Sequence, residues 1–479
     1  MTVLKMDRLN KKLIKIKEDG LYPLHMPGHK RNIALLTGTN RATNTEITVD
    51  KSFGDVLSGA YEIDITEIDG FDNLHDAKEV IFDAEKRAAS LYQSEETHFL
   101  VNGATSGILS AIFAVSKKGQ KIIVARNCHV SVYNAILLNE LEPIYVYPEI
   151  IEDGPLKIQG SMSLKEVEKA VISNPDACAI VITSPTYDGV LSDIAGLAKI
   201  AHEYDMPLIV DEAHGALFFM EGRSAINNGA DIVINSVHKT LPALTQTALI
   251  HINGNIADRA KVRKYLKVFQ TSSPSYVLMG SIDYAIEIME TEGKRLYRDF
   301  CIRTKRLKDE LYKLRNIKYI SKDMLTLNGA YDFDESKVLI ASNDSCGGGR
   351  EIYNLLREKY GLQPEMSAKD YVLLMTTLFD SDDGIDRLID ALFEIDYYIG
   401  KKKKLSTDAI ESEQSIDVGH EYYDRLTKLK ADIGKKSQYT IFAYPPGIPI
   451  IAASEIITEE KVEEIEKACI NMLDIKWVE

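Results

Sequence analysis

Between residues 95 and 255 the chain alternates short apolar runs rich in Val and Ile with longer stretches of helical periodicity. Near-continuous hydrophobic runs are typical of strands that are buried on both faces of a sheet. We predict seven strands, at Thr97–Val101, Lys121–Val124, Pro143–Tyr147, Ala179–Thr183, Pro207–Val210, Ile232–Asn235 and Ala248–Ile252. Helices are predicted between them at Gly107–Val115, Leu164–Ser173 and Ile194–Glu203. This alternation indicates a mostly parallel α/β sheet with helices on both sides.

Polar clusters follow two of these predicted strands. Asp211 comes directly after Pro207–Val210, and Lys239 follows Ile232–Asn235 in the segment Ser236-Val237-His238-Lys239. Ligands of open α/β sheets bind beyond the carboxyl ends of the strands. A lysine there can form a Schiff base with the aldehyde of pyridoxal 5′-phosphate (PLP), and a carboxylate can pair with the pyridinium nitrogen. The pair therefore predicts a PLP site, although Asp211 alone could merely cap a turn.

A phosphate-binding turn is predicted at Asn102-Gly103-Ala104-Thr105-Ser106-Gly107, which follows the first strand and opens a helix. Small residues allow close approach of the backbone, and a helix N-terminus offers unpaired N–H groups to an anion. Thr105 and Ser106 add hydroxyl groups, which could also be simple N-caps. Ser236 and His238 flank Lys239 and could complete a phosphate cradle.

Two histidines complete the predicted site. His129 lies in Arg126-Asn127-Cys128-His129, after the second strand, where an imidazole could stack on a planar cofactor. A lone histidine is more often a surface or core residue, but its place on the strand after the phosphate turn favours stacking. His214 follows Asp211 by three residues and could contact the oxygen side of the cofactor ring.

Composition excludes several other classes of protein. The net charge of −15 argues against nonspecific binding of nucleic acid. Five scattered cysteines form no CxxC pair, so we expect neither a disulfide framework nor a metal site. The N-terminus has no uninterrupted apolar core, and the longest uncharged stretch, 99–116, contains the polar turn described above. We therefore expect a cytoplasmic protein with no membrane span and no nucleic-acid partner.

A second α/β pattern follows the first. Residues 285–315 predict a long helix, and strands and helices alternate after it at Lys337–Ala341, Gly349–Tyr360, Tyr371–Thr377 and Asp383–Ile399. A polar stretch that opens with Gly400–Lys404 and continues to about Gly419 predicts an exposed linker, in which the lysine run is typical of a solvated helix end rather than a binding patch. We divide the chain into an N-terminal segment (1–45), a PLP-binding large domain (46–285), a small α/β domain (286–400), and a linker with a C-terminal domain (401–479).

Eight motifs carry a family resemblance. They are Leu24-His25-Met26-Pro27-Gly28-His29-Lys30, Asp72-Asn73-Leu74-His75, Asn102–Gly107, Arg126–His129, Asp211-Glu212-Ala213-His214-Gly215, Ser236–Lys239, Thr271-Ser272-Ser273-Pro274-Ser275-Tyr276 and Tyr444-Pro445-Pro446-Gly447-Ile448-Pro449. In these motifs the chain resembles the Orn/Lys/Arg decarboxylase family of fold-type I PLP-dependent enzymes, in the short form without an N-terminal wing domain. The resemblance extends over nearly the whole chain. It implies an aspartate aminotransferase-like large domain with a mostly parallel seven-stranded sheet, together with smaller α/β and C-terminal domains.

The resemblance also implies roles for individual residues. Lys239 matches the Schiff-base lysine, Asp211 the pyridinium partner and His129 the ring-stacking residue, while Thr105, Ser106, Ser236 and His238 match phosphate ligands. From their places in the sequence we add His214 as a catalytic and cofactor-binding candidate and Ala104 as a cofactor-binding candidate. Thr271 matches a phosphate contact from the neighbouring subunit, which implies a homodimer with shared active sites and allows a higher oligomer. Glu455 matches a glutamate near the distal cation of the substrate, and Asp188 is a second candidate for that carboxylate. The chain departs from the family around both acids, with Ala453-Ser454 before Glu455 and Asp188 where an aromatic residue is common.

The predicted activity is PLP-dependent α-decarboxylation of a basic amino acid to CO₂ and a polyamine-type amine. The sequence does not choose among arginine, lysine and ornithine. One cofactor supports several reactions on one fold, so an aminotransferase or an aldolase is an alternative. A non-catalytic PLP-binding regulatory protein is another, against which the Lys239–Asp211 pair weighs.

Overall fold

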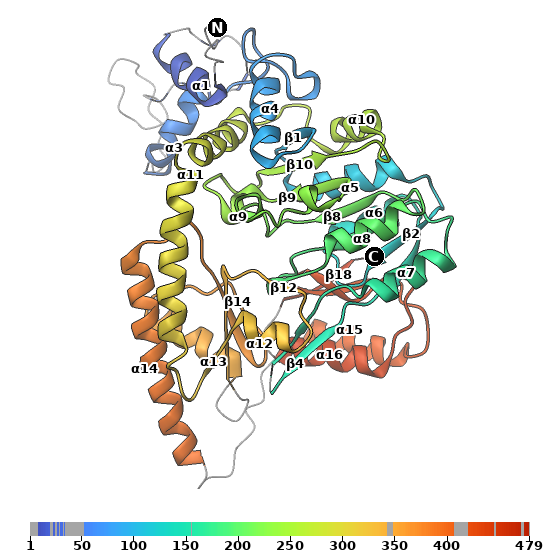
Figure 1. The fold of residues 1–479 in the computed structure, drawn as a ribbon, viewed down its shortest axis with the longest axis vertical. Helices are drawn as coiled ribbons and strands as arrows, with labels where there is room; N and C mark the ends of the chain where they lie inside the picture. Colours follow the sequence, from blue (N-terminus) through green and yellow to red (C-terminus); the bar gives the residue numbers. More distant parts are fainter. Residues whose placement is uncertain are drawn as a thin grey trace. The chain divides into compact units, whose positions relative to one another are not determined.

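The computed structural model describes residues 8–19, 23, 26, 27, 29–31, 33, 52–154, 156–342, 348–406, 420–444, 447–470 and 474–478. The chain forms two units, each assembled from two stretches of sequence. The first comprises Met1–Ser116 with Pro207–Arg295, and the second comprises Lys117–Met206 with Leu296–Glu479. We describe each unit by itself (Figure 1).

All seven predicted strands of the main sheet are present. They are β1 (Glu96–Leu100), β2 (Lys121–Ala125), β3 (Glu142–Val146), β6 (Ile180–Thr183), β8 (Leu208–Asp211), β9 (Ile232–Asn235) and β10 (Ala248–Ile252), in the order β1-β10-β9-β8-β6-β2-β3. β2 pairs in parallel with β3 and β6, and β8 pairs in parallel with β9. β10 runs antiparallel to both of its neighbours, β1 and β9. The prediction of a mostly parallel α/β sheet is confirmed.

Helices surround the first unit's strands. They are α1 (Leu9–Glu18), α3 (Ser52–Ile63), α4 (Val80–Tyr92), α5 (Gly103–Val115), α9 (Val237–Thr240), α10 (Arg259–Phe269) and the first part of α11 (Tyr276–Leu311). Short 3₁₀ turns lie at Leu74–Asp76, Phe218–Glu221 and Ala225–Asn228. Helix α5 begins at Gly103, before the predicted start at Gly107, and buries Ile108 and Ile112 completely. A Cβ at Gly107 would lie 2.6 Å from Leu100 Cδ1 and 3.2 Å from Ile234 Cγ2, so glycine is needed for the close approach of α5 to β9.

The second unit contains the other helices and several small sheets. Its helices are α6 (Val130–Leu138), α7 (Leu164–Ser173), α8 (Ile194–His202), α12 (Lys322–Leu327), α13 (Gly348–Asn354, followed by a π-helical turn at Leu355–Lys359), α14 (Asp382–Ser406), α15 (His420–Ala431) and α16 (Glu459–Ile470). A four-stranded sheet has the order β11-β13-β15-β14, with β11 Lys318–Ile320, β13 Lys337–Ala341, β14 Met366–Ser367 and β15 Tyr371–Met375. Two further antiparallel pairs belong to the unit: a hairpin of β4 (Ile150–Asp153) and β5 (Leu156–Gln159), and a long-range pair of β7 (Val190–Leu191) and β12 (Asp332–Phe333).

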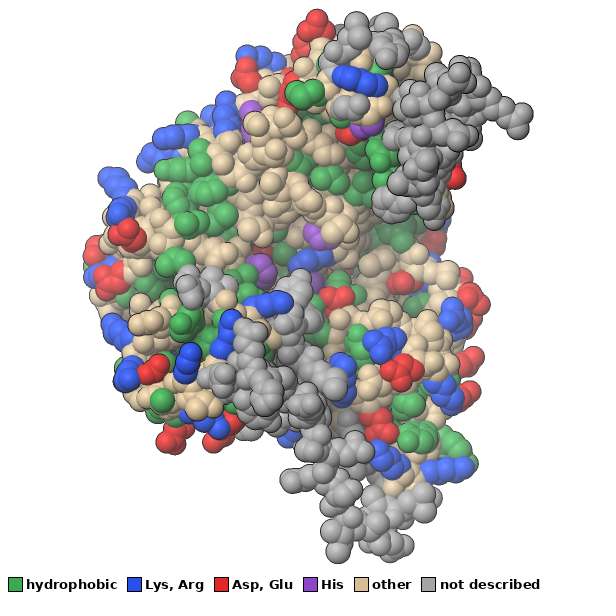
Figure 2. Space-filling model, turned by 180° about the vertical axis from the view of Figure 1, so that it is seen from behind, with side chains coloured by type: hydrophobic (Ala, Val, Ile, Leu, Met, Phe, Trp, Pro, Cys, Tyr) green, Lys and Arg blue, Asp and Glu red, His purple; other side chains and the backbone are tan. Residues whose placement is uncertain are grey.

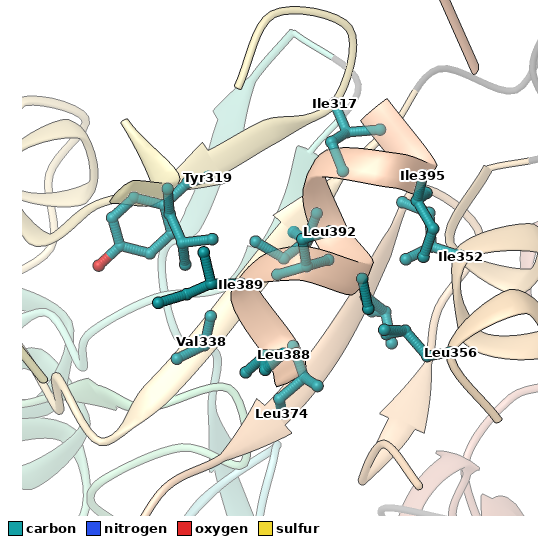
Figure 3. Close-up of a cluster of buried hydrophobic side chains, with 14 of the residues drawn as sticks. Ile317, Tyr319, Val338, Ile352, Leu356, Leu374, Leu388, Ile389, Leu392 and Ile395 are labelled. Atoms are coloured by element: carbon teal, nitrogen blue, oxygen red, sulfur yellow. The ribbon is translucent and has the colours of Figure 1, made fainter. Parts of the chain in front are cut away.

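The four-stranded sheet carries its own hydrophobic core. Helix α14 faces the sheet with Ile389, Leu392 and Ile395, and Figure 3 shows these side chains converging with Val338 and Leu374 from the strands. Leu392 and Ile395 are fully buried. Burial of these aliphatic side chains between α14 and the four-stranded sheet supplies most of the free energy that holds the two together.

A separate C-terminal layer contains the three-stranded sheet β17-β16-β18 (Ile448–Ile451, Thr440–Tyr444 and Asp474–Val478). Its core joins Ile441 and Ile451 from the sheet to Leu429 of α15 and Ile465 of α16. This layer supplies the segment that contacts the end of β2, described below.

The predicted linker begins too early. Helix α14 continues to Ser406, so the segment Gly400–Lys404 is the end of a helix rather than the start of a linker. Lys402 forms an ion pair with Glu351 at 2.7 Å. Residues 407–419 lie outside the described residues, and the division of the chain into four regions stays a prediction.

Acidic and basic side chains are interspersed on the face shown in Figure 2, with hydrophobic side chains between them. Within the described ranges, no helix is both long enough and apolar enough to cross a lipid bilayer. The same residues contain no cluster of three or more His, Cys, Asp or Glu side chains suited to a metal ion.

Candidate active site

The carboxyl ends of β8 and β9 place two of the predicted catalytic residues at one edge of the sheet. The two strands are parallel neighbours, with Asp211 opposite Ile234. Asp211 is the last residue of β8, is 4% exposed, and accepts a hydrogen bond at Oδ1 from the Ala213 amide at 3.1 Å. Lys239 follows β9 on the short helix α9. Since both strand ends face the same side, the carboxylate and the amine belong to one edge.

His214 and Lys239 are brought together directly. Lys239 Nζ lies 3.0 Å from His214 Nε2. His214 is buried, and Lys239 is partly buried. The structure therefore places the predicted covalent lysine beside an imidazole that can exchange a proton with it.

A buried glutamate holds the two strand ends in register. Glu212 is 1% exposed and accepts hydrogen bonds from the Ala225 amide (2.7 Å), Ser224 Oγ (3.1 Å) and Asn235 Nδ2 (3.0 Å). Asn235 Nδ2 also donates to the Glu212 carbonyl at 2.9 Å. Burial raises the pKa of Glu212 to about 8 despite these donors. This structural role of Glu212 was not predicted. Its one mark in the sequence is that an acid lies directly beside Asp211.

The predicted phosphate turn is held by contacts from two other segments. Gly103 has a φ of +73° and donates its amide to the Gln246 carbonyl at 2.9 Å. Asn102 forms no side-chain cap on α5, and its Oδ1 accepts from the Thr271 amide at 3.2 Å instead. The first-turn amides of α5 thus receive no side-chain cap from Asn102, an arrangement that suits an anion. Thr271 therefore lies beside the phosphate turn of its own chain.

The hydroxyl and imidazole groups of the predicted cradle differ in their environment. Thr105 is exposed, Ala104 is partly buried, and Ser106 is buried with its hydroxyl donating to the Gly103 carbonyl at 2.8 Å. Ser236 is 2% exposed and makes no capping hydrogen bond on α9.

The environment of His238 disfavours its charged form. Burial lowers the pKa of His238, and the charge of Lys239 lowers it further. The hydrogen bond of His238 with the Thr247 carbonyl acts in the opposite direction but is outweighed. Its Nδ1 lies 2.8 Å from the Thr247 carbonyl and must carry the proton, because a carbonyl only accepts. The imidazole can donate from Nε2 to a phosphate only when protonated, which a nearby dianion favours.

This donor set fits PLP. Lys239 supplies an amine for an aldehyde, Asp211 a buried carboxylate for a ring nitrogen, and the start of α5 amides and hydroxyls for a phosphate. These are the three chemical functions of the cofactor. The chain folds so that all three come from the ends of β1, β8 and β9.

His129, in the second unit, caps helix α6. Its Nδ1 accepts from the Ser131 amide at 3.2 Å and lies 2.9 Å from Ser131 Oγ. The neighbouring Val130 amide donates to the Gly447 carbonyl at 3.0 Å. The imidazole is therefore oriented by the first turn of α6, and the backbone directly after it is held by the C-terminal layer.

Glu455 pairs with a residue that the sequence analysis quoted without a role. Arg126 Nε and Nη2 donate to Glu455 Oε1 and Oε2 at 3.1 and 2.9 Å. Burial alone would raise the pKa of Glu455, but the hydrogen bonds and charge of Arg126 outweigh it and hold the pKa at about 2. The partners are 329 positions apart, so no local signal could pair them. The role of Glu455 as a substrate ligand stays a prediction, and Pro445 and Pro446 of the adjacent motif lie outside the described residues.

Asp188 is buried rather than exposed. It is 8% exposed and accepts a hydrogen bond from the Tyr371 hydroxyl at 2.5 Å. Burial raises its pKa to about 6, although the Tyr371 hydrogen bond lowers it. Tyr371 belongs to a hydrophobic cluster with Phe333 and Val190. These contacts give Asp188 a structural role, and its role as a substrate ligand stays a prediction.

Comparison with known proteins identifies the family. The model of the Orn/Lys/Arg decarboxylase major domain matches residues 8–336. An arginine decarboxylase of Bacillus subtilis is 31% identical over 454 residues, which cover 92% of this chain and 89% of that protein. An uncharacterised protein of the same organism, YaaO, is 33% identical over 486 residues, with 96% and 93% coverage. Among solved structures, the constitutive lysine decarboxylase of Escherichia coli matches with a TM-score of 0.76 at 19% identity, covering 98% of this chain and 79% of that one.

The chain belongs to the Orn/Lys/Arg decarboxylase family. It has the fold of fold-type I PLP-dependent enzymes, which its likeness to a PLP-containing serine palmitoyltransferase (TM-score 0.52, 13% identity, 66% and 76% coverage) also shows. It is a PLP-dependent carboxy-lyase that decarboxylates a basic amino acid. The predictions of fold, cofactor and reaction class are thus confirmed.

Proposed function

We propose that this chain is an arginine decarboxylase whose PLP is bound covalently by Lys239. The single observation that supports arginine is similarity, at 31% identity, to an arginine decarboxylase over 92% of the chain. Two observations support Lys239. Its amine lies 3.0 Å from His214 Nε2, and it follows β9, the parallel neighbour of the strand β8 that ends in Asp211.

Each residue has a defined task in this proposal. PLP, when bound, supplies an aldehyde for the substrate's α-amino group and a ring that takes up the electrons left when CO₂ departs. Lys239 holds the cofactor through its amine before substrate arrives, and His214 accepts or returns the proton on Lys239 Nζ. Asp211 would keep the ring nitrogen protonated, which would strengthen the ring as an electron sink. His129 would stack on the ring, the role of the family position that it matches.

The phosphate end is assigned to the start of α5 and to the segment before α9. Ala104, Thr105 and Ser106 offer amides and hydroxyls, and Ser236 and His238 offer a hydroxyl and an imidazole. A phosphate held by several donors fixes the ring plane relative to Asp211 and Lys239, and a small displacement of reacting groups is costly.

A substrate panel tests the proposed reaction. We expect CO₂ and the matching amine from arginine, with kcat/KM about 10- to 100-fold above the values for lysine and ornithine, as is typical for discrimination by chain length and end group. A keto acid instead of CO₂ would identify an aminotransferase. A preference for lysine or ornithine would overturn the choice of arginine and leave decarboxylation intact.

We further propose a cytoplasmic homodimer in which Thr271 serves the partner's site. The support is the family position of Thr271 and its exposed hydroxyl-rich segment 271–273. Thr271 also lies beside the phosphate turn of its own chain. An experiment must therefore distinguish a contact to its own site from a contact to the partner's site.

Subunit mixing separates them. Lys239→Ala and Thr271→Ala/Ser272→Ala are each expected to be inactive as homodimers. In a hybrid dimer, one site combines an intact Lys239 with an intact Thr271 only if Thr271 acts in trans. Random exchange should then restore about a quarter of wild-type activity, since half of the dimers are hybrids with one good site. A mixture that stays inactive while hybrids are detected by mass would place Thr271 in its own site.

A further inference from the structure

Arg126 is the hub of a buried network at the end of β2. It follows Ala125 directly and is 7% exposed. Besides its two bonds to Glu455, Nη1 donates to the Pro449 carbonyl (2.6 Å) and the Tyr133 hydroxyl (3.0 Å), and Nη2 donates to the Ile450 carbonyl (3.0 Å). These bonds use all five N–H donors of a guanidinium. Such a complete set cannot be reproduced by a lysine.

Glu455 is equally occupied. Its side chain is 13% exposed, and Oε2 also accepts from the Ala452 amide and from Lys461 Nζ, each at 2.8 Å. With both oxygens engaged by Arg126, the carboxylate is committed to contacts within the protein. Paired buried charges of this kind are costly to break, since removal of one leaves the other unpaired.

The same C-terminal segment contacts the backbone on the other side of His129. Val130 donates its amide to the Gly447 carbonyl at 3.0 Å. Tyr133 closes the loop, because its hydroxyl donates to the Arg126 carbonyl at 2.6 Å. His129 thus lies on a segment, 126–133, that is tied to residues 447–455 both before and after it.

We propose that Arg126 and Glu455 form a positioning clamp that couples the C-terminal layer to the orientation of His129. The clamp rests on the proposed role of His129 at the cofactor. It deepens that role by assigning Glu455 to Arg126 rather than to the distal cation of the substrate. The two assignments for Glu455 predict opposite kinetic signatures.

The decisive variants are Glu455→Gln, Arg126→Lys and their combination in the PLP-loaded enzyme. We expect each single change to lower kcat about 10- to 100-fold through misplacement of a group at the cofactor, with KM for arginine within about twofold of wild type. The double variant should be no worse than the more severe single variant, because the two residues act as one unit. Lys461→Met is the matched control: it removes the other cation at Glu455 without touching β2, and should keep kcat within about twofold.

Two readouts do not depend on turnover. Visible circular dichroism of bound PLP should weaken in both single variants, and hydrogen exchange should speed up in segments 126–133 and 447–455 together. A purely structural pair would lower the melting temperature and leave the dichroism and kcat unchanged. That result would contradict the clamp. The clamp would also be contradicted if Lys461→Met lowered kcat as much as Arg126→Lys does.

The distal-anchor assignment gives a different pattern. Glu455→Gln would then raise KM for basic substrates roughly 10- to 150-fold, as expected for loss of a charge-assisted contact, and Arg126→Lys would leave KM and the dichroism unchanged. That outcome would overturn the clamp while preserving the proposed function. Failure of the wild-type enzyme to release CO₂ from arginine would instead overturn the substrate, and the exchange and dichroism results would still decide the clamp.

Discussion

Replacing Lys239 with alanine should abolish turnover and the visible absorbance of covalently bound PLP. The amine at 3.0 Å from His214 is the proposed attachment point, and alanine has no amine with which to form that bond. The loss in kcat should be on the order of 10⁴-fold or more, as for removal of a covalent catalytic group. Absorbance spectra and CO₂ release from arginine measure the two effects.

Lys169→Ala provides the control for this experiment. Lys169 is an exposed lysine on α7 that pairs with Glu166 at 2.6 Å. Exposed pairs contribute little to stability, so this variant should keep both the absorbance and the activity. Retention of the absorbance band in Lys239→Ala would show that another lysine carries PLP.

Asp211→Asn should lower kcat about 10²- to 10³-fold with little change in thermal stability. The amide can still accept the hydrogen bond from Ala213 at Oδ1, so the end of β8 keeps its local geometry. It carries no charge, however, and cannot keep the cofactor's ring nitrogen protonated, so the expected loss is comparable to that of a preorganised electrostatic group.

A buried aspartate that is not among the proposed catalytic residues provides the comparison. Asp396 on α14 is 8% exposed and accepts from the amides of Arg315, Asn316 and Ile317 at 2.6 to 3.0 Å. Asp396→Asn should lower the melting temperature and leave kcat within about twofold. If Asp211→Asn behaves like Asp396→Asn, with normal turnover in a less stable protein, the proposed pairing with the ring is wrong.

The main sheet was predictable because its information is local. Each central strand is a short run of β-branched residues, such as Ile232–Asn235, followed at once by polar residues, and strand ends of a parallel sheet converge on one edge. The placement of Asp211 and Lys239 followed from this pattern. The reversed direction of β10 did not, because an apolar run carries no sign of its direction.

The contacts that depend on distant partners were not predictable. In the sequence, Asp188 follows a predicted core strand and has the pattern of a loop residue. Its burial depends on a contact with Tyr371, which is 183 positions away. Arg126 stands in a recognisable motif, but its pairing with Glu455 requires the docking of the C-terminal layer. The start of the linker was placed too early, although the lysine run within it does form the end of a helix as expected.

The most direct test of the account is reduction of the PLP-loaded enzyme with borohydride, followed by proteolysis and mass spectrometry. Borohydride fixes PLP permanently to the lysine that holds it. We expect a phosphopyridoxyl group on the peptide that contains Lys239. After pretreatment with excess arginine, we expect no label on that peptide. A label on any other lysine, or no label in an enzyme that releases CO₂ from arginine, would contradict it.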